Sequence, residues 1–413
     1  MINQASDSPD CRTCPDLSPE GKGGYTPQKI PGSITPHARG ATGRWRRAGI
    51  GALLFLAACA APREAAPDLP RLDPVAAQIF HADPRWLGGD AAVSVALGDD
   101  RILWLFGDSF VDLAPPYRRD EAAFPRNTVA LETGADPRDA RMAFFWRRDA
   151  KGVPASFFPE DGAEWFWPGG GIRLEDGMLA IFLQRIHAVT GGFGFATKGY
   201  AVMLIANPDE APDAWRLRRV DGPALPFDAL PGAAVLRDGP YVVALAVRQQ
   251  GTHAGAFVRY DAAALAKGDL TKAEWWAGDG RGWVATAALG TAGPAFVIDD
   301  AGAESSLHWD ACARAFVHVA SYGFGASDIG RREAARLTGP WSAPEAVLRP
   351  PESNGPAPFV YAGRAHAALA TPAGTEMLTY IASSFKPDEI ISATGQAQLY
   401  WPRVARVAAP ACK

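Results

Sequence analysis

The chain has 413 residues, 48% of them hydrophobic, and its 41 Lys and Arg against 45 Asp and Glu give a net charge of −4 at pH 7. The apolar content is sufficient for a large buried core, and the lack of a basic stripe excludes a protein that binds nucleic acid by neutralising phosphates. Cysteine is sparse, with five residues in the chain, which excludes a disulfide-dense secreted scaffold.

The first 58 residues are predicted to be a leader that ends in a secretory signal. About forty residues rich in Pro, Gly, Ser and Asp come first and are expected to be disordered. A basic cluster at residues 44–47 follows, then an apolar run over residues 48–56 and small residues up to Cys59. This order is typical of a secretory signal and is too short to span a bilayer as a stable helix.

The signal ends on Leu-Ala-Ala-Cys at residues 56–59, which resembles a bacterial lipobox. In that interpretation Cys59 is lipidated and becomes the first residue of the mature protein. Its acyl chains hold a monomer at the cell envelope, facing the periplasm or the cell surface, and are the only contact with the membrane. A plain secretory signal is the alternative.

Residues 59–75 contain four prolines and are predicted to form a tether to a folded domain over residues 76–413. Within that domain, Cys312 and Cys412 are able to pair in an oxidising periplasm. A buried thiol and a frayed C-terminal thiol are the favoured interpretation.

The folded domain repeats one pattern, in which an apolar strand reaches a polar turn and a second apolar strand follows. The turns fall near residues 100, 176, 238, 311 and 374, and two of them contain Asp-Gly, a strong hairpin signal. Their spacing of 62 to 76 residues suits one four-stranded sheet per repeat, and no long amphipathic helix interrupts it. The sequence therefore predicts an all-β fold, a five-bladed β-propeller, with a pair of β-sandwiches as the alternative.

Further strands are expected at residues 126–131, 199–206, 256–260 and 399–407. The last of these is predicted to complete the first blade and so to close the ring. Because the inner strand of each blade lines a central funnel, residues at one end of these strands are expected to converge on a common pocket.

The first blade offers two aspartates for this pocket. Asp90 lies ten residues before the turn at Asp100 and Asp108 lies eight residues after it, so both are expected near one rim on adjacent strands. Neighbouring carboxylates beside glycines suit glycoside hydrolysis, one as base or nucleophile and the other to tune its pKa or orient a sugar hydroxyl. A turn cap at Asp108 and a solvated Asp90 are the alternative. Glu304, which opens the inner strand of blade four, is the candidate general acid.

Polar and aromatic residues at equivalent places in the other blades, or beside the aspartates, are candidate ligand contacts. Aromatic faces stack on sugar C–H surfaces and charged groups bind hydroxyls, so such a lining suits carbohydrate. The predicted substrate-binding residues are Arg126, Asn127, Glu164, Trp167, Arg185, His187, Arg364 and His366. A structural arginine packed against an aspartate and a satisfied core histidine are the alternatives at Arg126 and His366.

The chain contains no nucleophile elbow, phosphate loop or zinc-protease motif, and no cluster has metal-ligand spacing. Its glycine runs lie in predicted hairpins without a following helix, so they are not nucleotide loops. No metal or cofactor is therefore expected, although an acidic funnel is able to hold a structural calcium ion.

Five stretches together resemble a bacterial family of uncharacterised five-bladed propellers, and the resemblance covers nearly the whole mature chain. They are residues 88–111, 126–129, 338–342, 361–366 and 399–403. Relatives of that family include endo-acting D-arabinanases of actinobacteria and, more distantly, the arabinanase and β-xylosidase propellers. The resemblance is specific for the fold and says little about the substrate.

The enzymes among these relatives use two aspartates of the first blade at the anomeric centre, a placement that Asp90 and Asp108 match. Likeness to the arabinanase-type propellers also implies inversion of the anomeric configuration. The blade-five motif departs from the common family form, which has Lys and Pro where this chain has Arg364 and Ala367. No residue is a clear match for the general acid.

Three functions are compatible with these patterns. The first is an envelope-anchored glycoside hydrolase that cleaves a polysaccharide, with arabinan-like furanosides as a candidate substrate and with Asp90, Asp108 and Glu304 in the chemistry. The second is a non-catalytic propeller that binds a glycan or a partner protein at the envelope, since a fold does not decide function. The third is an envelope assembly factor with a purely structural funnel. Ionisable residues gathered at one mouth would favour the first, and scattered ones the second.

Overall fold

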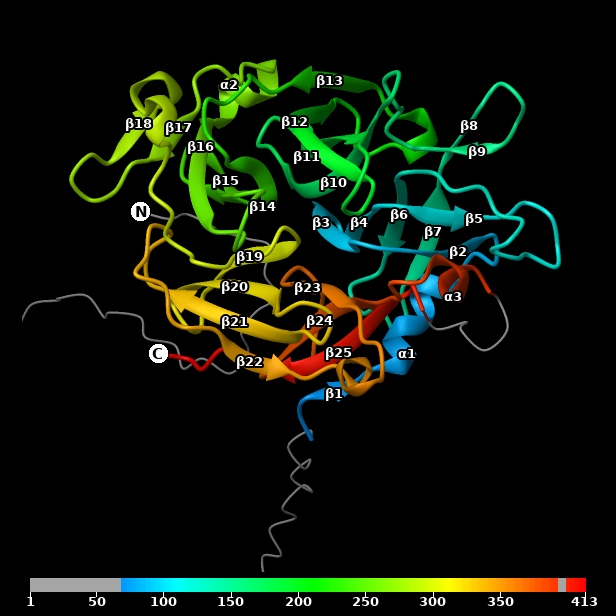
Figure 1. Cartoon of the computed structure of the whole chain (residues 1–413). Coiled ribbons are helices and arrows are strands. Elements are labelled where there is room, and N and C mark those ends of the chain that lie inside the picture. Colours follow the sequence, from blue (N-terminus) through cyan, green and yellow to red (C-terminus); the bar gives the residue numbers. More distant parts are fainter. Residues whose placement is uncertain (1–67, 393–398) are drawn as a thin grey trace, which may run out of the picture. The chain divides into compact units, whose positions relative to one another are not determined.

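Alternating apolar residues and tight turns build five antiparallel sheets that follow one another around a common centre (Figure 1). The computed structural model describes residues 68–392 and 399–413, so the predicted leader and Cys59 lie outside the described residues. The fold is the five-bladed β-propeller that the repeat spacing predicts, and the two-sandwich alternative is wrong.

The blades are numbered along the chain, and their strands are given from the innermost outward. Blade 1 consists of β3 (Val93–Gly98), β4 (Arg101–Phe106), β6 (Thr128–Thr133) and β7 (Arg141–Phe145). Blade 2 consists of β10 (Glu164–Arg173), β11 (Leu179–Ala188), β12 (Phe195–Ile205) and β13 (Leu217–Asp221). Blade 3 consists of β14 (Leu230–Asp238), β15 (Tyr241–Val247), β16 (Gly255–Asp261), β17 (Glu274–Trp276) and β18 (Trp283–Ala285).

Blade 4 consists of β19 (Ser305–Asp310), β20 (Ala315–Tyr322), β21 (Asp328–Ala334) and β22 (Glu345–Leu348). Blade 5 consists of β23 (Val360–Ala365), β24 (Thr375–Ala382), β25 (Pro402–Ala408) and β1 (Arg71–Leu72). Two small sheets flank blade 1, and they pair β2 (Trp86–Gly89) with β5 (Ser109–Val111) and β8 (Arg147–Arg148) with β9 (Pro154–Ala155). The short helices are α1 (Pro74–Ala77), α2 (Ala262–Lys267), α3 (Pro387–Ile391) and the 3₁₀ turns Gln78–His81, Pro212–Ala214, Thr286–Ala288, Gly290–Ala292 and Pro351–Asn354.

The first hairpin illustrates how the sequence specifies a blade. Val93, Val95 and Leu97 alternate along β3 and are buried against blade 2, while the residues between them are only partly buried. Asp99 and Asp100 both have positive φ, 53° and 54°, as a two-residue turn between twisted antiparallel strands requires. Aspartate tolerates this left-handed conformation better than most residues. The turn near residue 100 is present as predicted, and so are those near 176, 238, 311 and 374.

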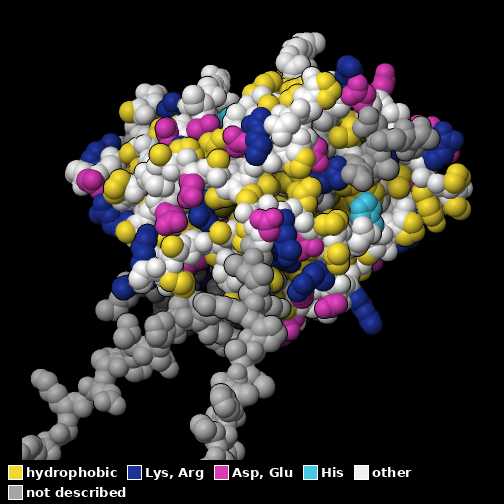
Figure 2. All heavy atoms as spheres, turned by 90° about the horizontal axis from the view of Figure 1, so that it is seen from below, with side chains coloured by type: hydrophobic (Ala, Val, Ile, Leu, Met, Phe, Trp, Pro, Cys, Tyr) yellow, Lys and Arg dark blue, Asp and Glu magenta, His cyan; other side chains and the backbone are white. Residues whose placement is uncertain are grey.

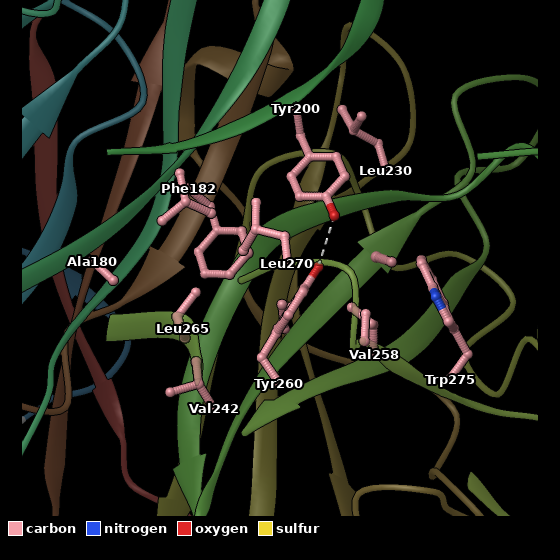
Figure 3. Close-up of a cluster of buried hydrophobic side chains, with 14 of the residues drawn as sticks. Ala180, Phe182, Tyr200, Leu230, Val242, Val258, Tyr260, Leu265, Leu270 and Trp275 are labelled. Carbon is pink, nitrogen blue, oxygen red and sulfur yellow. Dashed lines mark hydrogen bonds between the residues drawn. The ribbon is translucent and has the colours of Figure 1, made fainter. Parts of the chain in front are cut away.

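A separate hydrophobic cluster fills each interface between neighbouring blades. Figure 3 shows the one between blades 2 and 3, where Phe182 and Tyr200 lie near Tyr260 and a 3.2 Å hydrogen bond joins the two phenols. Leu265, from α2, packs into the same cluster. Corresponding clusters join blades 1 and 2, 3 and 4, 4 and 5, and 5 and 1. Because the centre is a channel, burial of apolar surface between blades is the main source of stability.

Blade 5 contains strands from both ends of the described chain. β1 pairs with β25, with Arg71 opposite Arg406 and Leu72 opposite Ala405. The side chain of Arg406 is buried and donates a 3.0 Å hydrogen bond to the Asp73 carboxylate, which also caps the N-terminus of α1. The N-terminal strand therefore closes the ring.

Two predictions about these segments are wrong. The strand expected at residues 399–407 belongs to blade 5, where β25 pairs with β24, and it does not complete blade 1. Residues 71–75, part of the predicted tether, form β1 and the start of α1. The prolines of this segment suggested a tether, but β1 is an edge strand, and edge strands accept neighbouring prolines because few of their backbone N–H groups pair.

Cys312 and Cys412 form a disulfide, contrary to the expectation of two separate thiols. Cys312 lies in the turn between β19 and β20, and Cys412 lies in the segment after β25, with Cα atoms 4.5 Å apart. The backbone N–H of Lys413 donates to the Cys312 carbonyl at 3.0 Å. The C-terminal segment is thus fixed to blade 4 after completing blade 5.

The five inner strands line a central channel of about 800 Å³. Four of these strands, β3, β10, β14 and β23, contain a β-bulge or a similar shift of register. Bulges redirect side chains and are common beside functional sites. In β10 the bulge follows Pro168, the residue after Trp167, and in β23 it directly follows Tyr361. Both aromatic residues lie at the same end of the channel as Asp90, because each is hydrogen-bonded to an aspartate of blade 1.

The face shown in Figure 2 carries basic and acidic side chains interspersed, with hydrophobic side chains scattered among them. No patch of a single charge sign covers that face. Among residues 68–392 and 399–413, none of the helices has both the length and the apolar character needed to cross a membrane.

We expect removal of the disulfide by Cys412→Ser to lower the free energy of unfolding by roughly 2–5 kcal/mol, because the bond closes a loop of 100 residues. Thermal unfolding followed by circular dichroism measures the change. Cys312→Ser should lower the melting temperature equally, and the double variant no further, because all three lose the same bond. Equal melting temperatures for the wild type and Cys412→Ser would contradict the assignment.

Candidate active site

Residues from four blades meet at one mouth of the channel. Each inner strand begins at this mouth, so the residues at its start, or directly before it, face the same space. They are Asp90 before β3, Trp167 in β10, Glu304 before β19 and Tyr361 in β23, joined by Asp108 after β4.

Asp90 is held by hydrogen bonds from the last blade and by the backbone of the first. Its Oδ2 accepts from the phenol of Tyr361 at 2.9 Å and from that of Tyr400 at 3.1 Å. Its carbonyl accepts from the Gly107 N–H at 3.1 Å. A Cβ at Gly107 would lie 2.4 Å from Asp90 Oδ1, so this close approach requires glycine.

Burial raises the pKa of Asp90 well above its ordinary value, and the negative charges of Glu304 and Asp108 raise it further. The hydrogen bonds from Tyr361 and Tyr400 act in the opposite direction, because they stabilise the ionised form. Glu304 and Asp108 therefore lie close enough to Asp90 to influence its ionisation. Like charges this close favour retention of a proton within the group.

Asp108 is bound by a cation and by an indole. Arg126 contacts its Oδ2 at 3.2 Å, and the Nε1–H of Trp167 donates to its Oδ1 at 2.9 Å. Burial raises the pKa of Asp108 to about 6, although Arg126 and Trp167 oppose the shift. Asp108 is thus mainly ionised at neutral pH.

Glu304 differs from the two aspartates because its carboxyl group accepts or donates no hydrogen bond within the part of the chain that the structure describes. Burial raises its pKa, and the charge of Arg364 opposes this shift. Arg364 is itself buried in the channel and donates a hydrogen bond to the backbone carbonyl of Ser305. Glu304 is thus a carboxyl group with a raised pKa and no fixed partner.

Glu164 and Arg185, predicted as substrate-binding residues, are bound to each other across blade 2. The Arg185 guanidinium lies 2.7 Å from the Glu164 carboxylate, which also forms an ion pair with Lys198. Hydrogen bonds from Lys198 and Arg185 lower the pKa of Glu164, so it does not resemble the raised carboxyls of the mouth. His187 lies opposite Glu164 in the strand register, half-buried.

Asn127 and His366, both predicted as ligand contacts, are held by hydrogen bonds from neighbouring groups of the fold. The Asn127 side chain is fully buried, where it donates to the carbonyls of Phe158 and Phe166 and accepts from the Phe158 N–H. His366 lies between the hydroxyls of Ser94 and Thr379, at 2.8 and 2.7 Å. Burial lowers the pKa of His366 to about 3, so it stays neutral.

Three residues that position the aspartates are not among the predicted site residues: Tyr361, Tyr400 and Gly107. Both tyrosines lie in the stretches that carry the family resemblance, and Tyr361 directly precedes the bulge of β23. Tyr400 lies more than 300 residues from Asp90 in the chain, and only the closed ring brings them together. Gly107 beside Asp108 was the one local signal, since glycine admits a close approach.

The described residues contain no group of three His, Cys, Asp or Glu side chains that could hold a metal ion. The structural calcium ion that the acidic funnel suggested remains a prediction.

A five-bladed propeller with clustered carboxyl groups at one mouth is the class that this fold and site define. The family model described as "Domain of unknown function (DUF5005)" matches residues 77–409, and the chain belongs to this family. No curated protein matches the chain.

A solved structure of another protein shows the same fold, and others match less well. One titled as a "putative hydrolase" from Bacteroides ovatus ATCC 8483 is 16% identical, with a TM-score of 0.64 over 81% of this chain and 89% of that chain. The xylan β-1,4-xylosidase of Bacillus halodurans C-125 is 11% identical, with a TM-score of 0.44, over 78% of this chain and 53% of that chain. The catalytic domain of a GH62 α-L-arabinofuranosidase from Coprinopsis cinerea is 10% identical, with a TM-score of 0.43, over 80% and 94%.

We expect Arg126→Gln to raise the pKa of Asp108 above about 6, because the guanidinium stabilises the ionised carboxylate by its charge and its hydrogen bond. Carboxyl ¹³C NMR of aspartate-labelled protein measures this pKa, and Asp108→Asn assigns the resonance. Arg185→Gln is the matched control and should leave it unchanged, since Arg185 binds Glu164. A fall in the pKa, or no change, in Arg126→Gln would contradict the assigned pairing.

Proposed function

We propose that this protein is an envelope-anchored glycoside hydrolase that cleaves glycosidic bonds in a polysaccharide. The observation that carries the proposal is the group of Asp90, Asp108 and Glu304 at one mouth of the propeller, with raised pKa values. Such a group supplies a protonated acid and an ionised base at the same pH, which is what hydrolysis of a glycosidic bond needs.

Glu304 is proposed as the general acid and Asp90 as the general base. Glu304 has a raised pKa and no hydrogen bond to its carboxyl group from the described residues, so it is free to protonate the leaving oxygen as the glycosidic C–O bond breaks. Asp90, oriented by two phenols, takes a proton from the water that attacks the anomeric carbon. The products are two sugar ends, and solvent returns the protons. This single displacement inverts the anomeric configuration.

Asp108 is proposed to position the sugar. Its carboxylate is fixed from two sides by Arg126 and Trp167, so it is oriented before any ligand arrives. A fixed carboxylate beside the reaction centre is suited to a sugar hydroxyl, and its negative charge keeps the pKa of Asp90 raised. Arabinan-like furanosides are the first substrates to test, on the strength of the family resemblance. Binding of glycan without cleavage would instead support the non-catalytic alternative.

The envelope location is part of the proposal. The lipobox at residues 56–59 provides the anchor, and the disulfide between Cys312 and Cys412 suits an oxidising compartment such as the periplasm or the cell surface. A glycan of the envelope or of the surroundings is accessible from that position.

Hydrolysis is tested by reducing-end release from a panel of envelope and plant polysaccharides. We expect Asp90→Asn and Glu304→Gln each to lower the rate roughly 10³-fold or more with the melting temperature nearly unchanged, because each removes a proton-transfer group. Glu175→Gln, at the exposed opposite end of the channel, is the control and should keep full activity. Full activity in both site variants, or no cleavage of any polysaccharide by the wild type, would refute the enzymatic proposal.

Cys59→Ala should release the protein from membranes into the soluble fraction, because the acylated residue is lost. Fractionation followed by a salt wash measures the partition. Cys11→Ala, which alters a cysteine outside the lipobox, is the control and should remain with the membranes. A Cys59→Ala variant that stays bound after the wash would contradict the lipobox assignment.

A further inference from the structure

Two rows of aromatic side chains lead outward from the aspartates. The first, named the blade-2 row, consists of Trp167, Phe195 and Phe193. Trp167 binds Asp108, its ring contacts Phe195 edge-on with centroids 4.5 Å apart, and Phe195 stacks with Phe193 at 6.2 Å. Exposure grows along the row, since Trp167 is half-buried while Phe195 and Phe193 are 37% and 63% exposed.

The second, named the blade-5 row, consists of Tyr361, Phe359, Phe385 and Phe324. Tyr361 binds Asp90 and stacks with Phe359 at 4.9 Å, which stacks with Phe385 at 4.2 Å. Phe385 in turn contacts Phe324, from the loop between β20 and β21, at 5.5 Å. Phe385 is 47% and Phe324 75% exposed.

The rows diverge on opposite sides of blade 1. One begins at Asp108 and enters blade 2, whereas the other begins at Asp90 and enters blade 5. Blades 2 and 5 are the two neighbours of blade 1, each joined to it by its own hydrophobic cluster (Figure 1). The carboxyl groups therefore lie between the rows, and not at the end of a single track.

The outer members of the rows are unusual for this surface. Of the large hydrophobic side chains that are exposed among the described residues, four of nine belong to these rows, and all four are phenylalanines. Phenylalanine side chains are normally more stable when buried in a core. Exposed rings that form two continuous rows therefore indicate a ligand surface.

Charged groups on the side of the blade-2 row favour a sugar chain over a lipid surface. The Arg126 guanidinium lies over the Trp165 ring at 4.6 Å, and Lys198 is exposed beside Glu164 on blade 2. Aromatic rings with charged groups nearby suit pyranose or furanose rings, which have C–H faces and hydroxyl edges. Insertion into hydrocarbon would leave these charges desolvated.

We infer that the blade-2 and blade-5 rows bind a polysaccharide chain on both sides of the carboxyl groups, so that cleavage is internal. The inference deepens the proposed function and rests on it for the cleavage step. Binding by the rows requires no catalysis and is tested separately.

Binding is measured by native affinity electrophoresis in gels that contain debranched arabinan, xylan or β-1,3-galactan. The protein is the full chain with Cys59→Ser, which carries no lipid, and Glu304→Gln, which prevents cleavage. We expect one of these polysaccharides to retard it, and Phe193→Ala and Phe324→Ala each to weaken binding roughly 3- to 10-fold by loss of ring stacking. Val75→Ala, a 60% exposed residue outside both rows, is the control and should bind unchanged.

Retardation by none of the three polysaccharides, or equal retardation of Phe193→Ala, Phe324→Ala and Val75→Ala, overturns the inference. Binding of the rows to vesicles of phosphatidylethanolamine and phosphatidylglycerol would also overturn the inference. If the Cys59→Ser chain sediments with these vesicles and Phe324→Ala does not, the rows contact a membrane.

Product analysis separates this inference from the proposed function. With catalytically intact Cys59→Ser protein, internal cleavage should lower the viscosity of the retarding polysaccharide well before reducing ends accumulate. Phe193→Ala and Phe324→Ala should raise KM several-fold with kcat nearly unchanged, because they remove binding that substrate and transition state share. Release of single sugars from the start overturns internal cleavage. Row-dependent binding without any cleavage overturns the proposed hydrolase and leaves the binding surface standing.

Discussion

The hydrogen bonds from Tyr361 and Tyr400 to Asp90 are the interaction on which the rest of the site depends. Tyr361 lies 271 positions from Asp90 in the chain and Tyr400 lies 310 positions from it, so these bonds connect the last blade to the first. Asp90 is thus oriented by blade 5, and β1 completes that blade by pairing with β25. The geometry of the site is therefore a property of the whole propeller, and any change that loosens the contact between blades 1 and 5 should reach Asp90 first.

At this mouth, burial and neighbouring charges act in opposite directions on the pKa values of the carboxyl groups. Burial raises the pKa of each of the three carboxyl groups, and two arginines and an indole keep the shifts from becoming larger for Asp108 and Glu304. The outcome is three acids of the same chemistry in different environments. Asp108 is bound on both sides, Asp90 is bound by phenols, and Glu304 is free of fixed partners, which is why different roles can be assigned to them.

Local patterns in the sequence predicted the fold well and the site in part. The hairpin turns follow from short-range chemistry such as the positive φ of Asp99 and Asp100, so the five blades could be predicted. Asp90, Asp108 and Glu304 could be named because their offsets from the turns are local. The closing strand, the partners Tyr361 and Tyr400, and the structural role of Asn127 could not, because each depends on contacts between segments far apart in the chain. Glu164 lies at a similar distance from its hairpin turn but is bound by Arg185. Sequence spacing alone does not predict that pairing.

The place of β1 has a consequence for how the chain folds. Asp73, directly after β1, meets its partner Arg406 across 333 residues, and the first of the described strands pairs with the last. Contacts of such long range slow folding, because loop-closure entropy is lost before the contact forms. Until β1 arrives, blade 5 presents β25 as an unpaired edge, and such edges invite association with other chains. A chain tethered near its N-terminus would keep β1 close to the point of anchorage while the remaining blades assemble, and would shorten the search that completes the ring.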